Sequence, residues 1–550
     1  MMASAGSRID EGSSITSEIY ADIPESIVNG NKGIKVEDSI TIHPVCGNRC
    51  FLLGSTQQVI TITLVNESDW FEESNSKESE PWESTFDNLL SNLQSNYMNS
   101  QDRIPKHTVL RSLSYLDLVD IPFMNTPYLY AHNICREKGS GTYHFYSTGS
   151  GDMNIKAFGR QYFRWGWKYS WNHRSIPRSA WWRQEEGLFI SQQFLPYHIY
   201  HFSESVNQLL LKFLNRSQYP VLTHLYLPQF DNQTEFVWSK TYLNLLVRIF
   251  PPSVRPTLVF SKSTDQPELE CFRSVTLIDR MAYNSDGGIF GGFLPQDLMR
   301  GMSYKQAKVP SRKFYSHSWN LLFLERQRDR KWLRKHEYIN HLRRHFEPLL
   351  SISQSSMRNL SYEDQVRLFY STDIVLGGHG SAMTNVMFMT PHSVLIECNP
   401  PFFYEMCFAN IAFLSRVHYV SVANYNEKYV PSKLKNAQEL YQNGQIFLKR
   451  RNYAQLSIYP DYRLVVDAVE DALEYVKRWH LSFRVIDQWS LIFNTYTCLL
   501  ETYSLFCLAR LFPCHEYDCW DYSVQAKGRR CPMECLFPSS EVMSSVKQHS

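Results

Sequence analysis

Residues 372–397 read TDIVLGGHGSAMTNVMFMTPHSVLIE. The short apolar run Ile374–Leu376 predicts a buried strand, which ends in a turn rich in glycine. A helix-compatible stretch from Ala382 to Met389 follows, and the apolar run from Ser393 to Ile396 predicts a second strand. The segment therefore predicts a strand, a tight turn, a helix and a strand, in the order expected of an α/β fold.

The turn after the first strand has the chemistry of an anion site. Glycine at the end of a buried strand lets the backbone approach a ligand, and a helix that begins there directs its N–H groups and positive dipole toward that ligand. His379 adds a side chain that can donate to phosphate oxygens, and Thr384 and Asn385 follow about one helical turn later. The predicted phosphate-binding residues are therefore Gly377, Gly378, His379, Gly380, Ser381, Thr384 and Asn385.

A structural interpretation of this turn stays open, because glycine-rich turns in α/β proteins also serve packing alone. Two other enzyme classes are excluded by spacing. A hydrolase nucleophile elbow needs G-x-S-x-G, and Ser381 lacks glycines two residues to either side. A dinucleotide-binding turn needs G-x-G-x-x-G, which this stretch does not contain.

The same residues resemble the signature of glycosyltransferase family 61. In that signature an aspartate and a hydrophobic run precede G-x-H-G-A-G-x-T-N and a V-I-E strand, and here Ser381 and Ala382 replace the usual alanine and glycine. The resemblance covers about residues 195–425. It implies an α/β fold of the GT-B type, in which two Rossmann-like halves face a cleft. It also implies transfer of a sugar, N-acetylglucosamine or xylose above all, from a UDP-sugar to a hydroxyl of a protein or glycan.

A second informative stretch, HIYHFSESVNQLLLKFL, covers residues 198–214. Leucine and phenylalanine recur at helical spacing, and His201 and Glu204 are three residues apart on another face. A histidine oriented by a carboxylate is a workable general base for a sugar hydroxyl. An ordinary helix start with a capping pair remains the alternative. The family resemblance favours a catalytic pair, with Glu204 where aspartate is commoner.

Two further candidates follow predicted strands. Arg326 ends the run LLFLER, where a guanidinium can hold a diphosphate with two hydrogen bonds, and the resemblance associates this arginine with the nucleotide phosphates. Glu397 ends the second strand of the opening segment, where a carboxylate either accepts ribose hydroxyls or anchors a neighbouring loop. In the family, the block that contains Glu363 and Gln365 lies beside the nucleotide.

Composition limits the class of protein. The 550 residues are 43% hydrophobic and 14% aromatic, which is enough for packed cores in two or three domains. A formal net charge of +2 gives no support for extensive binding to nucleic acid or anionic membranes, so any anion site is local.

Cysteine usage favours an oxidising compartment. Of twelve cysteines, six crowd the end of the chain: Cys498, Cys507, Cys514, Cys519, Cys531 and Cys535. They predict a disulfide-linked tail, and Cys46 with Cys50 and Cys398 with Cys407 are close enough in sequence to pair; reduced packing cysteines are the alternative. Sequons at Asn66, Asn215, Asn232 and Asn359 permit the endoplasmic reticulum or Golgi lumen. No signal or anchor is visible at the N-terminus, so either the start is misplaced or the protein is not secreted.

The order of the segments predicts five regions. They are a disordered leader (1–40), an N-terminal extension with strands and an aromatic-rich segment (41–185), a first Rossmann-like half on the acceptor side (186–310), a second half on the nucleotide-sugar side (311–480) and the Cys-rich tail (481–550). Pro295 and Pro310 are expected to bracket a linker between the halves. The amphipathic run Tyr462–Val476 is expected to be a closing helix that crosses back to the first half.

The expected reaction is a single displacement with inversion, in which His201 and Glu204 take the acceptor proton and Arg326, His379 and backbone amides stabilise the departing diphosphate. No metal or other cofactor is required by this scheme. Nucleic acid is not an expected partner, and any membrane association would need an N-terminal anchor that this chain does not show. The rival interpretations are a non-catalytic pseudoenzyme that serves as a nucleotide- or glycan-binding scaffold and, third, a cytosolic nucleotide-dependent enzyme.

Overall fold

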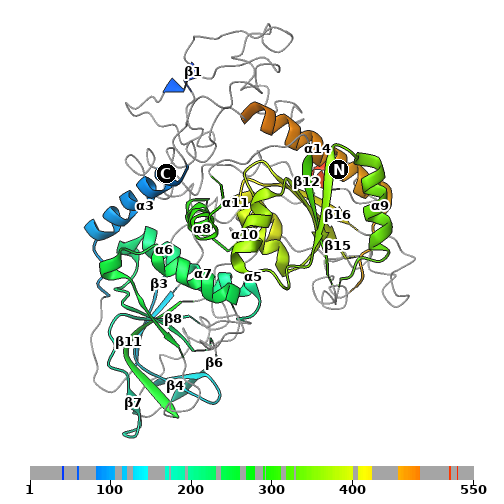
Figure 1. The fold of residues 1–550 in the computed structure, drawn as a ribbon. Helices are drawn as coiled ribbons and strands as arrows, with labels where there is room; N and C mark the ends of the chain where they lie inside the picture. Colours follow the sequence, from blue (N-terminus) through cyan, green and yellow to red (C-terminus); the bar gives the residue numbers. More distant parts are fainter. Residues whose placement is uncertain are drawn as a thin grey trace, which may run out of the picture. The chain divides into compact units, whose positions relative to one another are not determined.

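The structure is a computed structural model, and it describes most residues between 82 and 483 (Figure 1). The described ranges are 82–105, 114–119, 128–146, 168–172, 175–191, 196–228, 230, 237–260, 268–278, 289–290, 293–310, 318–326, 330–400, 407–423 and 456–483, with the strand pairs 40–41, 59–60, 520–521 and 529–530. The chain divides into two units, residues 1–80 with 510–516 and residues 81–509 with 517–550. The predictions for the leader and for the cysteines near either end fall outside the described residues.

The second half is built on a parallel sheet. Its strands are β12 (Trp319–Leu324), β13 (Leu350–Ser355), β14 (Ile374–Gly378), β15 (Val394–Asn399) and β16 (His418–Ala423), in the spatial order β13-β12-β14-β15-β16. The short strands β17 (Trp520–Asp521) and β18 (Arg529–Arg530) extend it. Every residue of β14 and β15 is buried, as expected for parallel strands covered on both faces. The strand order reverses between β12 and β14, which is the topological switch point of such sheets.

Helices cover this sheet for reasons visible in their sequences. Helix α10 (Tyr362–Ser371) begins at Ser361, whose Oγ accepts a hydrogen bond from the Asp364 backbone N–H at 3.0 Å, so the predicted cap is confirmed. Helix α9 (Lys335–Phe346) and helix α11 (Cys407–Leu414) complete the βα units. Helix α14 (Tyr462–Phe483) packs its apolar side into the core of β12, β14, β15 and β16. The expectation of a helix that crosses to the first half is therefore replaced by packing on its own sheet.

The first half contains a mixed sheet. Strands β8 (Leu188–Ser191), β9 (His224–Leu227), β10 (Thr257–Phe260) and β11 (Leu269–Ile278) are parallel in the order β10-β9-β8-β11, with a switch point between β8 and β11. The two sheets with their flanking helices are consistent with two Rossmann-like domains.

The segment expected as an N-terminal extension joins this first sheet. Strand β4 (Tyr128–Glu137) pairs antiparallel with β11, and β3 (Tyr115–Val119), β5 (Thr142–Tyr146), β6 (Lys168–Asn172) and β7 (Trp181–Trp182) pair onto β4, β5 or β11. A disulfide links Cys135 to Cys271 across the β4–β11 pair. Cys398 and Cys407 are both buried free thiols, so the predicted pairing of these two is wrong: Cys398 lies inside β15 and Cys407 begins α11.

Helices α5 (Ile199–Val206), α6 (Gln208–Leu214) and α7 (Val237–Arg248) lie beside the first sheet, and the short 3-10 helices η2 (Arg216–Gln218) and η4 (Pro252–Val254) follow α6 and α7 (Figure 1). Helix α3 (Trp82–Asn99) precedes them in the chain. Among the described helices, none is long and apolar enough to cross a bilayer.

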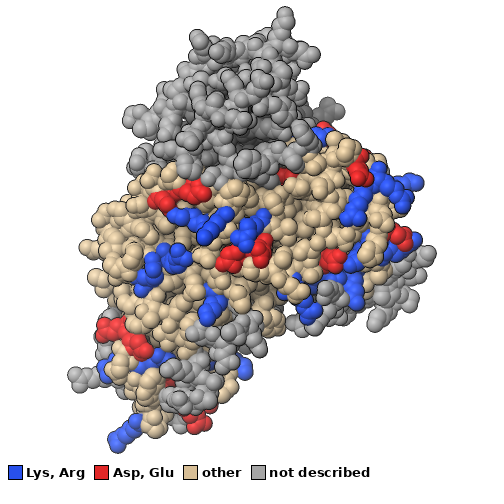
Figure 2. All heavy atoms as spheres, viewed as in Figure 1, with Lys and Arg blue, Asp and Glu red and all other residues tan. Residues whose placement is uncertain are grey.

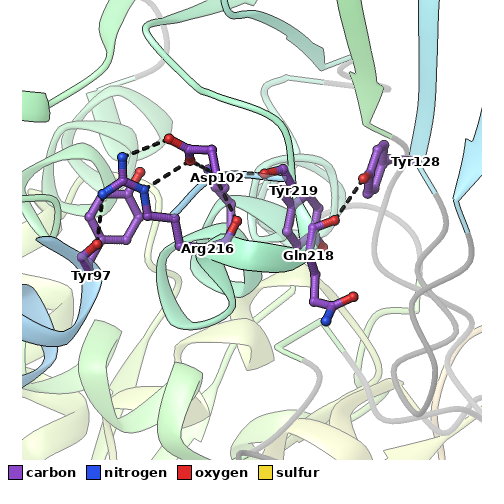
Figure 3. A network of polar contacts seen from close by, with 7 residues as sticks. Tyr97, Asp102, Tyr128, Arg216, Gln218 and Tyr219 are labelled. Carbon is purple, nitrogen blue, oxygen red and sulfur yellow. Dashed lines mark hydrogen bonds and ion pairs between the residues drawn. The ribbon is translucent and has the colours of Figure 1, made fainter. Parts of the chain in front are cut away.

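A polar network ties the segment after α3 to the end of α6 (Figure 3). Arg216 donates from Nε and Nη2 to the two carboxylate oxygens of Asp102 at 3.0 and 2.7 Å, and Lys212 donates to the same carboxylate at 2.5 Å. Nearby, the Tyr128 hydroxyl donates to the Gln218 carbonyl at 2.7 Å. Burial lowers the pKa of Lys212 to about 8, although Asp102 opposes this shift. Because α6 continues directly from α5, the network fixes the helical pair that carries His201.

The predicted linker between the halves is wrong. Residues Phe293–Ala307 form helix α8, and Pro295 stands in its first turn, where proline is tolerated. Arg300 is 1% exposed, and it donates to the Met387 carbonyl at 2.7 Å and to the Ser415 carbonyl at 3.0 Å. The Tyr304 hydroxyl donates to the Phe388 carbonyl at 2.8 Å. This helix therefore binds directly to the segment that contains the glycine turn.

Candidate functional site

The candidate site lies where β12 and β14 end, at the switch point of the second sheet. Strand β14 runs into the glycine turn, and Arg326 follows β12 by two residues. Arg326 Nη1 donates to the His379 backbone carbonyl at 2.8 Å. Since ligands of open α/β sheets bind outside the carboxyl ends of the strands at such a point, the predicted arginine and the predicted turn meet at the expected place.

The glycines of the turn serve two purposes. A Cβ atom at Gly380 would lie 1.5 Å from Arg326 Nη1, so this glycine makes room for the guanidinium against the backbone. A Cβ atom at Gly378 would lie 2.2 Å from Ile458 Cδ1 in the core, so that glycine serves packing. Gly378 therefore serves packing, whereas Gly380 allows the close approach of Arg326, and the predicted phosphate site at the turn stays a prediction.

The His379 side chain is held by buried side chains of the second sheet and of α11. Its Nδ1 lies 2.6 Å from Glu397 Oε1, and the Tyr419 hydroxyl donates to Glu397 Oε2 at 2.7 Å. The Phe408 ring contacts the imidazole with 4.9 Å between ring centroids. His379 is 5% exposed and Glu397 is fully buried, so the carboxylate lies behind the histidine.

The segment after the turn is the 3-10 helix η5 (Ser381–Phe388), and its polar residues differ in exposure. Ser381 is partly exposed, whereas Thr384 and Asn385 are fully buried. Asn385 Nδ2 donates to Gln365 Oε1 at 2.8 Å, and its Oδ1 accepts from Trp238 Nε1 of α7 at 3.3 Å. The Asn385 amide therefore joins the turn to the first half. The Thr384 hydroxyl is buried with no hydrogen-bond partner among the described residues.

Glu363 and Gln365, which precede the turn in the chain, also have protein partners. Glu363 Oε1 accepts from Gln306 Nε2 at 3.0 Å, and Gln365 donates to the Leu360 carbonyl at 3.1 Å. Gln365 thus supports η5 through Asn385.

His201 and Glu204 form the predicted pair at the start of α5. His201 Nδ1 lies 3.0 Å from Glu204 Oε2, and the His201 side chain is 30% exposed while that of Glu204 is 3% exposed. The extra methylene of glutamate therefore does not prevent the contact. His198 is the N-cap of α5, and its ring lies against that of His201 with 4.5 Å between centroids.

Electrostatics show that the two halves bring their candidate residues together. Burial first, and then the neighbouring His201, Arg330, Arg326 and His379, together lower the pKa of His198 to about 3. These groups come from α5, from the segments after β12 and from the turn after β14, and all act on one imidazole. The Tyr200 ring also contacts Phe408, which itself packs on His379.

Sequence reasoning missed several of these residues. His198 had a usable signal, since it lies three residues before His201 in the same helix start. No sequence signal marked Tyr419, Phe408, Trp238 or Arg330, because each comes from an element that only the fold brings to the turn.

One face of the described residues carries mixed charge. On the face shown in Figure 2, lysine and arginine are interspersed with aspartate and glutamate. Among the described residues, no group of three or more histidine, cysteine, aspartate or glutamate side chains is arranged to hold a metal ion.

Part of the chain matches a known protein family. Residues 192–396 match the family model described as Glycosyltransferase 61, and they include every residue discussed at the turn and in α5 except Glu397 and the residues after it. The EGF domain-specific O-linked N-acetylglucosamine transferase of Pan troglodytes is 24% identical over 254 residues, which are 43% of this chain and 44% of that protein. The protein of the same name from Gallus gallus is 22% identical over 250 residues, 42% of this chain and 43% of its own length.

The similarity is therefore distant and spans less than half of these relatives. The family match, residues 192–396, contains the glycine turn, the strand-end arginine and the histidine–glutamate pair. Residues 192–396 of this chain thus match glycosyltransferase family 61, with distant similarity to EGF domain-specific O-linked N-acetylglucosamine transferases.

Proposed function

We propose that the protein is an inverting glycosyltransferase of the GT-B type, which moves N-acetylglucosamine or xylose from a UDP-sugar to a hydroxyl of a protein or glycan. The observation that carries the proposal is the 2.8 Å contact between Arg326 Nη1 and the His379 carbonyl at the switch point of the second sheet. This contact holds a guanidinium against a glycine turn, where a diphosphate would receive hydrogen bonds from both. The name of the relatives, EGF domain-specific O-linked N-acetylglucosamine transferase, supports N-acetylglucosamine as the sugar.

The proposed donor site comprises the glycine turn from Gly377 to Ser381 with Arg326 and His379. The acceptor hydroxyl enters from the first half, beside His201. As the acceptor oxygen forms its bond to the anomeric carbon, His201 takes the proton, and the bond from that carbon to the diphosphate oxygen breaks. The electron pair leaves with the diphosphate, whose charge Arg326 and His379 stabilise. Glu204 orients the His201 ring throughout.

The disulfide between Cys135 and Cys271 supports a location in the endoplasmic reticulum or Golgi lumen, since such bonds persist in oxidising compartments. The proposed partners are therefore a UDP-sugar and a luminal glycan or protein.

Ligand-binding measurements test the proposed donor site. UDP, UDP-N-acetylglucosamine and UDP-xylose should raise the thermal midpoint, because a ligand that binds only the folded state stabilises it. Arg326→Ala should weaken UDP binding by about tenfold to a hundredfold, as expected when a hydrogen bond to a charged group is lost. Arg334→Ala is the matched control, since Arg334 is exposed and paired with Glu337. Equal UDP affinity in both variants would remove Arg326 from the site.

Sugar-transfer assays test the proposed catalytic role of His201. His201→Ala should retain UDP affinity and lower kcat by about a hundredfold or more, the usual contribution of a general base. His345→Ala is the control, because His345 also pairs with a glutamate, Glu470, but lies on α9 with its side chain 46% exposed. Full activity of the His201 variant would refute its assignment. UDP binding without transfer to any acceptor, in the wild type, would favour the scaffold interpretation.

A further inference from the structure

Glu397 occupies the interior of the second sheet rather than its surface. It lies in β15 between β14 and β16, with Gly377 and Ser421 as its register partners. Tyr419 is two residues before Ser421, so the two side chains of β16 share a face. The Glu397 side chain is fully buried, and each carboxylate oxygen already has a partner within the protein.

This arrangement conflicts with a carboxylate that binds ribose directly. A buried carboxylate must keep its hydrogen bonds, because an ionised group without partners is costly in the interior. A ribose hydroxyl would therefore have to displace His379 from Oε1 or Tyr419 from Oε2. The 2.6 Å contact with His379 and the 2.7 Å contact with Tyr419 instead form a continuous chain from β16 to the turn.

This hydrogen-bond chain from Tyr419 through Glu397 is one of three contacts that fix His379. Glu397 holds ring atom Nδ1, Arg326 holds the backbone carbonyl, and Phe408 contacts the ring. Since a carboxylate only accepts, the hydrogen of the contact lies on Nδ1. In the proposed donor site, the other ring nitrogen, Nε2, would then donate to a phosphate oxygen, and the imidazolium form donates through both nitrogens at once.

We propose that Glu397 and Tyr419 are positioning residues that act through His379 on the diphosphate of the donor, a role that rests on the proposed function. Tyr419 orients the carboxylate, the carboxylate orients the imidazole, and the imidazole donates to a diphosphate oxygen. Glu397 does not bind the ribose.

The experiment distinguishes an effect on diphosphate binding from an effect on ribose binding. Isothermal titration calorimetry measures the affinity of wild type, Tyr419→Phe and Glu397→Gln for UDP, 2′-deoxy-UDP and inorganic pyrophosphate at one pH and salt concentration. Both variants should weaken UDP and pyrophosphate by the same factor, about threefold to tenfold for one hydrogen bond. The ratio of UDP to 2′-deoxy-UDP affinity should not change. Tyr338→Phe is the control, since Tyr338 is another buried tyrosine of this half whose hydroxyl donates to a carbonyl, that of Pro460.

Two outcomes overturn the inference while leaving the donor site intact. In one, the variants bind pyrophosphate as the wild type does. In the other, Glu397→Gln loses the discrimination between UDP and its 2′-deoxy form, which would make Glu397 a ribose ligand. A wild type that binds neither UDP nor pyrophosphate would overturn the proposed function and this inference together.

A second readout distinguishes positioning from general destabilisation. In a His379→Ala background, Tyr419→Phe should have no further effect on pyrophosphate affinity, because the residue through which it acts is gone. Glu397→Gln should also retain more affinity than Glu397→Ala, since the glutamine oxygen can still accept from Nδ1. Tyr419→Phe removes only a hydroxyl, so it decides the question even if Glu397→Ala does not fold. An undiminished effect of Tyr419→Phe without His379 would contradict the proposed path.

Discussion

Single residues of the turn show how a local pattern acquires a specific role. Gly380 has an extended backbone with φ 173°, so its backbone conformation does not require glycine. The requirement comes from Arg326, whose Nη1 and Cζ would lie 1.5 and 2.7 Å from a Cβ atom at this position. The close approach of the guanidinium to the backbone is therefore the reason for glycine here.

Gly380→Ala should move the Arg326 guanidinium away from the His379 carbonyl. Because the end of an arginine side chain is flexible, the protein should still fold, while UDP affinity falls by about tenfold through the lost hydrogen bond. Titration of UDP by calorimetry, with the thermal midpoint in parallel, measures both effects.

Gly139→Ala is the matched control, since a Cβ atom there would have no neighbour within 4 Å. If Gly380→Ala binds UDP as tightly as this control does, the position of Arg326 does not matter for the diphosphate.

The elements around the turn explain why some predicted ligands lie in the interior. Helix α8 donates to the carbonyls of Met387 and Phe388, and helix α7 donates to Asn385, so η5 is held by two helices of the preceding half. Asn385 was predicted to face the ligand from its place one helical turn after the glycines. The structure gives its amide three partners inside the protein, Gln365, the Ala382 carbonyl and Trp238, and we therefore expect it to support the turn.

Trp238→Phe should destabilise the protein by about 1 to 3 kcal/mol, since it leaves the buried Asn385 oxygen without the indole donor. The remaining phenyl ring keeps an aromatic group against Tyr242, whose ring is stacked at a centroid distance of 5.0 Å. Denaturant unfolding at neutral pH measures the change.

The comparison variant is Trp332→Phe. Trp332 is also buried, at 6% exposure, but its indole nitrogen has no hydrogen-bond partner among the described residues. Both variants lose ring volume and only Trp238→Phe loses a hydrogen bond, so equal destabilisation would show that the contact with Asn385 contributes nothing measurable.

At the scale of the molecule, the two sheets each place their candidate residues after strands at a switch point. His198 and His201 follow β8 of the first sheet, and Arg326 and the glycine turn follow β12 and β14 of the second. His418 is buried and His198 and His392 are partly buried, which makes stability depend on pH.

Stability should fall between about pH 6.5 and pH 4. Burial lowers the pKa of His392 to about 4 and those of His198 and His418 to about 3. The unfolded chain, with histidine near 6.5, binds more protons than the folded protein across this window. The stabilising contribution is therefore fully present above about pH 6.5 and is lost as the pH falls toward the folded values. Denaturation midpoints at pH 7.5 and pH 4.5 measure the loss.

The double variant His392→Asn, His418→Phe should have a smaller pH dependence than the wild type. Asparagine tolerates the positive φ of 62° at position 392, and phenylalanine keeps the stacking on Tyr475 at 4.2 Å. His345→Gln, on an exposed histidine, serves as the control. An unchanged pH dependence in the double variant would assign the acid sensitivity to other groups.

Local sequence was sufficient for those features that depend on neighbouring residues. The strand before the glycine turn, the cap at Ser361, the arginine after β12 and the pair of His201 with Glu204 all follow from periodicity, hydrogen-bonding capacity and spacing within one segment. These features persist in the fold because each is formed by residues a few positions apart.

Tertiary structure decided which of those residues face one another and which turn inward. Periodicity shows that Glu397 ends a strand run, but only the pairing of β15 with β16 brings Tyr419 to its second oxygen. Similarly, two prolines suggested a linker, while burial of Arg300 and Tyr304 against the carbonyls of η5 stabilises a helix there. The physical reason is that hydrogen bonds between distant segments, and the burial that makes them necessary, depend on the packing of sheets and helices that no single stretch of residues contains.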